Sequence, residues 1–474
     1  MNACDVGSGK PHRPGALDLL ARPYLVFLGI TLLYVAFPSY HFNADALHYN
    51  LLALLTAQDP AVLFQDRTVA THFLWHLLAA AVVGVTKPAN PEQSLYALRA
   101  LNIVLALASI FVFMQIVRAS AGRHAAAWAG LILAFSHACL RSFLSVEVYA
   151  LNNLVLAGLL FTVQRLAARG LDAVRTLDAL FLALLTILAI ATHAANALVV
   201  PALLVFFGLQ APRKAVRLGA VYAAATSALF LAMLGGIGVA SGGDIDGAAR
   251  MFFNYAGDTD AFVSADVVRS LGVSLGSTAE GFLGPYAAWI LVPLGMGIWY
   301  GAGRWRQVRF SSWIGFLIAY VFVMALFLGI WDPGNIEHKI AMFPPLLLLA
   351  TAVHASTGRN LQGAALAGAV LIALLVVAVG VAEGARPYTR IEDYSLFHLS
   401  SEIRSNTKED EVVVVGLASE RAGHPVTLAA MTFFNQRVVV LNQEDPGFEE
   451  KLRAYRERRF AVLEYEKEHG LRRR

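Results

Sequence analysis

Long apolar stretches separated by short polar connections dominate the pattern along this chain of 474 residues. A helix that crosses a bilayer needs about 20 mostly apolar residues. The stretches of that size predict eleven transmembrane helices, near residues 18–37, 96–117, 124–143, 147–165, 177–193, 194–210, 217–236, 283–301, 311–330, 340–356 and 361–383. The pattern therefore predicts an all-α polytopic membrane protein.

Whether a further apolar stretch, residues 69–85, crosses the membrane is indicated by the positions of the cationic residues. Arginine and lysine clusters prefer the cytoplasmic side of a membrane. Here they stand at Lys10/Arg13/Arg22, Arg118/Arg123, Arg165/Arg169/Arg175, Arg213/Lys214/Arg217, Arg304/Arg306/Arg309 and Arg359. All of them face the cytoplasm, together with the N-terminus, only if 69–85 returns to the side it came from. We therefore expect 69–85 to lie on the membrane; a true span with one misjudged neighbour is the alternative.

This topology places the polar connections on the outer face of the membrane. They are 38–95, the turn at 141–147, the turn near His193, the loops 237–282 and 331–339, and the tail after 384. The connections on the inner side are short and basic. We therefore expect the working surface of the protein to be extracytoplasmic.

The tail changes composition and predicts a small α/β domain over 384–474, after a transmembrane domain over 1–383. Glu411–Gly416, Arg437–Leu441 and Phe460–Tyr465 read as short strands. Between them, Pro425–Phe434 and Pro446–Arg456 read as helices. Strands that alternate with helices favour a parallel sheet.

Composition agrees with a membrane protein and excludes other classes. The chain is 57% hydrophobic and 15% charged, with a mean hydropathy of +0.59, whereas soluble proteins carry about 25% charged residues. A net charge of +4, with the arginines in short clusters, reflects membrane orientation and not nucleic-acid binding. Cys4 and Cys139 make no disulfide framework.

The first outer connection contains the strongest candidate for catalysis, in the stretch "FNADALHYN". Asp45 stands at a membrane boundary, where an ionisable group is costly and therefore a functional candidate. It can act as a general base on an acceptor hydroxyl, beside His48 and Tyr49 as substrate-binding residues. The alternative is that Asn43 or Asp45 only caps a helix.

Three further polar residues stand on outer connections. Arg67, after Asp66, is able to clamp a phosphate or to pair locally with that aspartate. Glu147 either faces Asp45 across a cavity as a second catalytic acid or is satisfied by water or Tyr149. His193, at an outer turn, either binds a ligand or is a buried core histidine.

A second dense polar cluster, "WDPGNIEHK", lies between two apolar stretches. His338 and Lys339 are candidates for binding an anionic lipid headgroup such as a phosphate, and a solvated loop with a snorkelling lysine is the alternative. Glu337 beside them is a further substrate-binding candidate. No cofactor is evident, no metal motif stands out, and no ligand spacing supports a divalent metal.

Several of these segments resemble, in the same order, motifs of the GT-C class of glycosyltransferases, in particular its bacterial branch similar to protein O-mannosyltransferases. "NADALHY" looks like the first-loop acidic motif, with alanines where the common form has a second acid. "THFLWHLLAA" is similar to the histidine-led segment of that loop, and "LYALRALNIVLAL", with Arg99, to the start of the next span. "SVEVYALNNLVLAG", "THAANALVVP" and "WDPGNIEHKIAMFPPLLLL" resemble later outer motifs.

The resemblance implies transfer of a sugar from a polyprenyl-phosphate carrier to a protein, lipid or glycan acceptor at the outer face, with inversion at the anomeric carbon. In the reaction that the resemblance implies, Asp45 is the base, and Glu147 and His193 shape the cavity. Arg67, His338 and Lys339 neutralise the leaving phosphate. The expected location is a bacterial inner membrane. The sugar, the acceptor and the oligomeric state stay open.

Two other functions remain open. A transporter or lipid-linked sugar flippase would show inverted repeats and polar residues near the bilayer midplane. The chain has no such repeat, and its polar residues cluster at one boundary. A noncatalytic scaffold would tolerate joint replacement of Asp45, Glu147 and Lys339.

Overall fold

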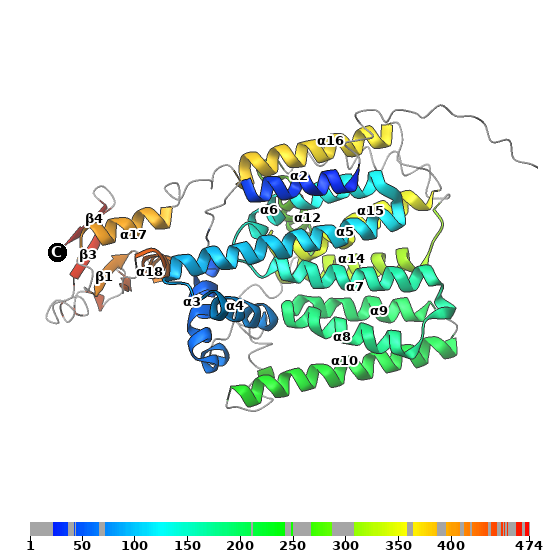
Figure 1. The fold of residues 1–474 in the computed structure, drawn as a ribbon, viewed down its shortest axis with the longest axis horizontal. Helices are drawn as coiled ribbons and strands as arrows, with labels where there is room; N and C mark the ends of the chain where they lie inside the picture. Colours follow the sequence, from blue (N-terminus) through cyan, green and yellow to red (C-terminus); the bar gives the residue numbers. More distant parts are fainter. Residues whose placement is uncertain are drawn as a thin grey trace, which may run out of the picture.

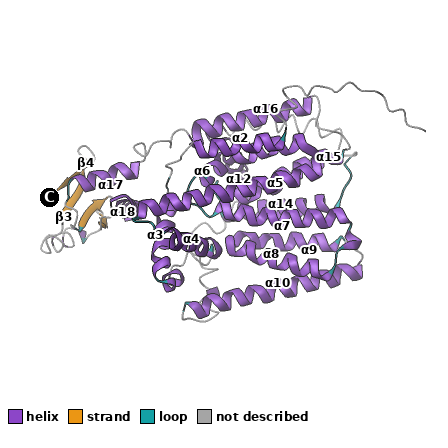
Figure 2. Ribbon diagram, viewed as in Figure 1, coloured by secondary structure: helices purple, strands orange, loops and turns teal. Residues whose placement is uncertain are grey.

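The computed structural model is a bundle of helices with a small sheet at one end (Figure 1). It describes residues 22–36, 42, 44–65, 72–209, 212–241, 248–249, 267–286, 308–357, 364–385, 395–407, 412–417, 420–434, 438–442, 447–448, 450, 453, 461–466 and 470–473. Helices make up the bundle, and the described strands lie in the C-terminal segment (Figure 2).

The bundle contains α2 (Pro23–Ala36), α5 (Pro91–Phe135), α6 (His137–Phe143), α7 (Tyr149–Arg169), α8 (Thr176–Thr192), α9 (Val199–Gly208), α10 (Pro212–Ala240), α12 (Val267–Leu283), α14 (Ser312–Trp331), α15 (Phe343–Ser356) and α16 (Ala364–Val379). Among the described residues, four helices are long and apolar enough to cross a membrane, namely α5, α7, α10 and α14. Shorter apolar helices cover most other predicted spans, and the predicted span 283–301 falls almost entirely outside the described residues. The number of spans stays a prediction.

The two predicted spans 96–117 and 124–143 meet at Gly122, which interrupts α5 with φ 86° and ψ 178°. That φ lies in the region that glycine adopts without strain. Asn50 Nδ2 donates to the carbonyl of Pro91 at 2.9 Å, and Asn102 Nδ2 donates to the carbonyl of Glu147 at 2.7 Å. Both ends of this stretch therefore lie at the same end of the bundle, and the chain reverses at Gly122.

The first outer connection forms α3 (Ala44–Gln58), the 3₁₀ helix η1 (Pro60–Gln65) and α4 (Phe73–Thr86). Helix α3 runs across the direction of the bundle helices (Figure 1). The Tyr49 ring packs against Trp75 and His76 of α4, with centroids 5.3 and 5.1 Å apart. At 14 residues α4 is about 21 Å long, shorter than a hydrocarbon core of about 30 Å. That it lies on the membrane stays a prediction.

The prediction of a loop over 237–282 is wrong at both ends. Helix α10 continues to Ala240, and α12 forms a second helix over Val267–Leu283. Its small polar residues Ser270, Ser274 and Ser277 are buried, while Val268 and Leu275 on other faces are exposed. Serine and glycine lower the average hydropathy, which hides the helical period from a search for long apolar stretches.

The C-terminal segment folds as α17 (Ser395–Ser405), β1 (Val413–Leu417), α18 (Glu420–Phe434), β2 (Val438–Asn442), β3 (Ala461–Glu466) and β4 (Gly470–Arg473). The strand order is β2-β1-β3-β4. Strand β1 pairs in parallel with β2 and with β3, as strand–helix alternation predicts. The antiparallel β4 and helix α17 were not predicted. Most of the predicted helix Pro446–Arg456 lies outside the described residues. The domain boundary at 384 stays a prediction.

Aromatic side chains join this C-terminal segment to the bundle. Helix α18 packs against α3 and the start of α5. The ring of Phe42, which is fully buried, lies 6.3 Å from that of Phe433 and 6.5 Å from that of Tyr96. The C-terminal segment is thus docked beside the helix that begins with Asp45.

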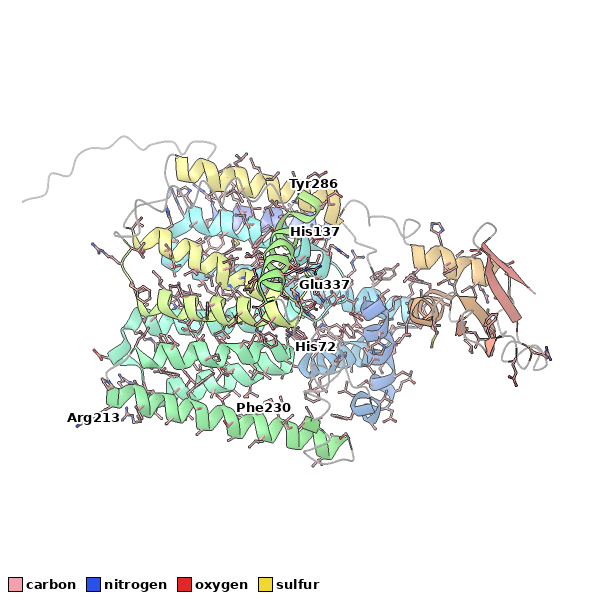
Figure 3. All side chains as sticks on the ribbon, turned by 180° about the vertical axis from the view of Figure 1, so that it is seen from behind. His72, His137, Arg213, Phe230, Tyr286 and Glu337 are labelled. Atoms are coloured by element: carbon pink, nitrogen blue, oxygen red, sulfur yellow. The ribbon has the colours of Figure 1, made fainter. Side chains whose placement is uncertain are left out.

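Cationic residues gather at the opposite end of the bundle. Arg118 donates to the hydroxyl of Tyr24 at 2.7 Å, and Lys214 Nζ donates to the carbonyl of Asp172 at 2.6 Å. Arg213 lies at the end of the bundle away from the sheet, whereas His72 and Glu337 lie toward the sheet (Figure 3). The two ends therefore differ in charge as the topology predicts, while their assignment to the two sides of a membrane stays a prediction.

Candidate active site

A cavity of about 230 Å³ opens at the end of the bundle that carries α3 and the sheet. Four segments that are far apart in the sequence form its walls: the start of α3, the residue before α4, the turn before α7, and the connection after α14. Its lining residues are Asp45, Tyr49, His72, Glu147, Val148, Tyr149, Trp331, Asp332, Asn335, Glu337 and His338. The fold thus brings together most of the polar residues singled out in the sequence. Figure 3 labels two of the lining residues, His72 and Glu337.

Two carboxyl groups, those of Asp45 and Glu337, face this cavity together. Asp45 lies in the first turn of α3 and is exposed. Burial raises the pKa of Glu337; the charge of Arg141 opposes this shift, and the charge of Asp45 adds to it. Glu337 therefore keeps its proton to higher pH than an ordinary glutamate.

Glu147 is held in the cavity wall by Asn102 of α5. The Asn102 Nδ2 donates to the carbonyls of Ser145 and Glu147, at 2.8 and 2.7 Å, and its Oδ1 accepts from Trp75 Nε1 at 3.3 Å. Glu147 is only 3% exposed. One asparagine therefore connects α4, α5 and the turn that presents this buried acid.

The connection between α14 and α15 is a hydrogen-bonded turn that presents His338. Asn335 Oδ1 accepts from the backbone N–H groups of Glu337 and His338, at 2.9 and 3.4 Å. His338 Nδ1 lies 3.0 Å from Asp332 Oδ2, and its ring stacks on Trp331 at 4.7 Å. Partial burial would raise the pKa of Asp332, but His338 beside the carboxylate holds that pKa below its ordinary value.

Lys339 is turned away from the cavity. Its Nζ donates to Ser274 Oγ at 2.9 Å, to the Leu328 carbonyl at 3.1 Å and to the Asp332 carbonyl at 3.4 Å. Burial lowers the pKa of this fully buried lysine to about 8, against the favourable charge of Asp332. Lys339 therefore ties the turn to α12 and to the end of α14.

His193 lies behind the cavity wall and contacts three lining residues. Its ring centroid is 4.9 Å from that of His72, 5.7 Å from Tyr149 and 6.2 Å from His338. Its Nδ1 accepts from the N–H of Ala195 at 3.2 Å. It supports the wall and does not line it.

The other predicted residues are placed as follows. Tyr49 lines the cavity, while His48, half-buried in α3, does not and packs against the Tyr49 ring at 6.1 Å. Arg67 lies outside the described residues.

Sequence reasoning did not select the cavity residues His72, Tyr149, Trp331, Asp332 and Asn335. Each stands in or beside a segment that was selected, and His72 is also the first histidine of the histidine-led segment "THFLWHLLAA". Among the residues that the structure describes, no three His, Cys, Asp or Glu side chains are grouped to hold a metal ion.

Comparison with known proteins gives a family match over part of the chain. Residues 73–216 match the model of the family described as "Protein O-mannosyl-transferase TMEM260 N-terminal domain". This range contains Glu147 and His193 but neither Asp45 nor the turn 331–339. A comparison with curated protein sequences gives no match.

Solved structures match over nearly the whole chain. ArnT from Cupriavidus metallidurans in the apo state is 13% identical, with a TM-score of 0.58 over 94% of this chain and 93% of that one. The same protein bound to undecaprenyl phosphate gives a TM-score of 0.56 at 14% identity, over 93% of this chain and 89% of that one.

A third match is the archaeal oligosaccharyltransferase AglB from Archaeoglobus fulgidus, in complex with an inhibitory peptide and a dolichol-phosphate. It gives a TM-score of 0.56 at 13% identity, over 93% of this chain and 69% of that one. At these identities the likeness concerns the fold. This chain therefore has the fold of the polytopic GT-C glycosyltransferases, and its residues 73–216 match the N-terminal domain of a protein O-mannosyl-transferase family.

Proposed function

We propose that this protein transfers a sugar from a polyprenyl-phosphate-sugar to an acceptor hydroxyl in the cavity beside α3. The observation that carries the proposal is the convergence of Asp45, Glu147, Glu337 and His338, from distant segments, on one cavity at one end of a GT-C fold. The undecaprenyl phosphate bound to ArnT and the dolichol-phosphate bound to AglB support a polyprenyl-phosphate carrier.

Asp45 acts as the general base. It is exposed at the start of α3 and lines the cavity, where the neighbouring Glu337 holds its own proton to higher pH than an ordinary glutamate. Asp45 takes the proton of the acceptor hydroxyl as the oxygen attacks the anomeric carbon. The bond from that carbon to the phosphate oxygen breaks on the opposite face, so the configuration inverts and polyprenyl phosphate leaves with the bonding electrons.

His338 stabilises the leaving phosphate. Asp332 Oδ2 lies 3.0 Å from its Nδ1 and the ring stacks on Trp331, so the imidazole is held in place. A polar group that is already in place where negative charge grows lowers the barrier without reorganisation. Arg67 remains a proposed cation for the same phosphate. The sequence-based role of Lys339 changes from phosphate ligand to anchor of this turn, because its Nζ binds Ser274 and two carbonyls.

Glu147 and Tyr49 orient the acceptor or the sugar in the cavity, and His193 supports the wall behind them. The exposed rims of α3 and of the turn 331–339 face the outer side of the membrane in the proposed topology, with the sheet on the same side. The location that fits best is a bacterial inner membrane, with a cytoplasmic N-terminus.

The test is transfer by membranes that contain Asp45→Asn and are supplied with radiolabelled donor lipid. We expect a fall of at least about a hundredfold, the typical size of general-base catalysis, with the protein still folded. Asp59→Asn is the matched control, because Asp59 is also exposed at the end of α3 but only accepts from the Ala61 N–H. Unchanged transfer in Asp45→Asn would remove the base assignment.

The rival function is movement of a lipid-linked sugar or a solute across the membrane. It predicts that Asp45→Asn cells accumulate the substrate on the cytoplasmic side, whereas a transferase defect leaves the donor lipid on the outer side. Protection of the accumulated lipid from an added impermeant oxidant separates the two functions.

A further inference from the structure

His72 has a tautomer that the backbone determines. It is 8% exposed, lines the cavity, and stands immediately before the first residue of α4. Its Nδ1 lies 3.3 Å from the carbonyl oxygen of Thr192. A carbonyl oxygen only accepts hydrogen bonds, so Nδ1 carries the proton and Nε2 carries the lone pair in the neutral ring.

His193 reinforces this arrangement. Its ring contacts His72 at 4.9 Å, and its Nδ1 accepts from the Ala195 N–H, so its own proton stands on Nε2. Burial lowers the pKa of His72 to about 4 and lowers the pKa of His193 well below its ordinary value, with neighbouring histidines adding to the shift. Near neutral pH the two rings are uncharged, each in one tautomer.

We propose that Nε2 of His72 accepts a hydrogen bond from a hydroxyl group of the transferred sugar, and so selects a hydroxylated sugar on the donor lipid. This inference rests on the proposed function. An uncharged acceptor requires a partner that donates, and an ionised phosphate has no proton to donate. The group therefore recognises the sugar part of the donor and not its phosphate.

Burial makes this contact selective. A cavity acceptor that loses its partner is left unpaired, and the cost of an unpaired buried polar group exceeds the gain from an average hydrogen bond. His72 does not act as the base, because a ring this readily deprotonated removes protons poorly. Its role is to bind and orient.

Three variants separate the acceptor atom from the rest of the ring. His72→Gln keeps an acceptor near the position of Nε2, His72→Asn keeps a donor to Thr192 but removes that acceptor, and His72→Phe keeps only the ring. His124→Gln serves as the control, since this half-buried histidine lies near Gly122 at the opposite end of the bundle. Thermal unfolding of each purified variant verifies that it is folded.

The measurement is binding of undecaprenyl phosphate, undecaprenyl-phosphate-mannose and undecaprenyl-phosphate-glucose, by native mass spectrometry in detergent. We expect the wild type, His72→Gln and His124→Gln to bind at least one sugar lipid about tenfold more tightly than the bare carrier, the size of one such hydrogen bond. His72→Asn and His72→Phe should lose this preference and keep their affinity for the bare carrier.

Different results overturn different statements. The acceptor role of Nε2 is excluded if His72→Asn and His72→Phe still prefer the sugar lipid to the bare carrier. It is also excluded if His72→Gln loses that preference as they do. Equal binding of all three lipids by the wild type also excludes it, while leaving a polyprenyl-phosphate site in place. If the wild type binds none of the lipids, the proposed function fails as well.

Discussion

His338 and Lys339 are neighbours in the sequence, but their side chains lie in different environments. The ring of His338 lines the cavity, whereas the ammonium of Lys339 is fully buried against Ser274 and the end of α14. The sequence assigns both to phosphate binding because both are basic side chains at one membrane boundary. Only packing separates the residue that meets a substrate from the residue that fixes the turn.

The titration of Lys339 tests this placement. Its pKa in the folded protein is about 8, below its ordinary value of 10.5, so between these values the unfolded chain binds more protons. The free energy of unfolding of the wild type should therefore rise with pH in this window, relative to Lys339→Met, by about 1–3 kcal/mol. Chemical denaturation in detergent at pH 7.5 and pH 10.5 measures the difference. Parallel pH profiles of the two proteins would show that the ammonium is solvated.

The candidate site was predictable to the extent that chemistry follows from local sequence. Asp45, Glu147, Glu337 and His338 were found as ionisable groups at membrane boundaries, and the structure gathers them around one cavity. His72 was not chosen as a site residue, although it is the first histidine of the segment "THFLWHLLAA", because that resemblance assigned it no role. Its tautomer depends on the Thr192 carbonyl, 120 residues away in the chain.

At the scale of elements, two glycines near one another in sequence have different packing. Gly380 begins the π-helical turn after α16, and a methyl group there would meet the carbonyl oxygen of Phe135. Gly368, in α16 itself, has open space around it. Close approach of α16 to the end of α5 thus requires glycine at only one of the two positions.

Gly380→Ala should therefore destabilise the protein by about 1–3 kcal/mol or more, since backbone cannot move aside as a side chain can. Gly368→Ala should be neutral or slightly stabilising, because alanine favours a helix over glycine. Thermal unfolding in detergent compares the two variants. Equal effects of the two substitutions would mean that α16 does not approach α5 as described.

At the scale of the whole molecule, the C-terminal segment is part of the frame around the cavity. Phe433 of α18 packs against Phe42, three residues before Asp45. Phe397 of α17 adds a ring contact to Phe433 at 5.3 Å. Through these ring contacts the C-terminal segment packs directly against the residues that precede α3.

Phe433→Ala should loosen α18 and the start of α3 together, because the half-buried ring of Phe433 no longer covers the fully buried ring of Phe42. Hydrogen exchange should rise by about tenfold over 420–434 and over the first turns of α3, with little change in α10. Met431→Ala is the matched control, since Met431 is 38% exposed on the same helix. An increase confined to α18 would show that the two segments are not coupled.

The predicted orientation of the whole molecule is tested by labelling. With Cys4 and Cys139 replaced by serine and alanine, Asp59→Cys should react with an impermeant maleimide added outside intact cells. Lys214→Cys should react only after the membrane is opened. Asp59 and Lys214 lie near opposite ends of the bundle, so each variant is the control for the other. Reversed labelling would place the cavity in the cytoplasm.

The sequence by itself determined the class of the protein, the positions of most helices, and the difference in charge between the two ends of the bundle. These follow from hydrophobic length, from the period of apolar residues and from arginine placement, all of which are local properties. It also determined three of the four strands described in the C-terminal segment, two by short runs of valine and one by the apolar run at Phe460–Tyr465.

The tertiary structure alone decided that α12 is a helix with serines inward, that the C-terminal segment docks on α3, and that Lys339 turns inward while His72 faces the cavity. Each of these depends on groups that are distant in the chain, such as Ser274 for Lys339 and Thr192 for His72. A side chain's surroundings, and hence its charge and its tautomer, arise only when those distant groups are packed together.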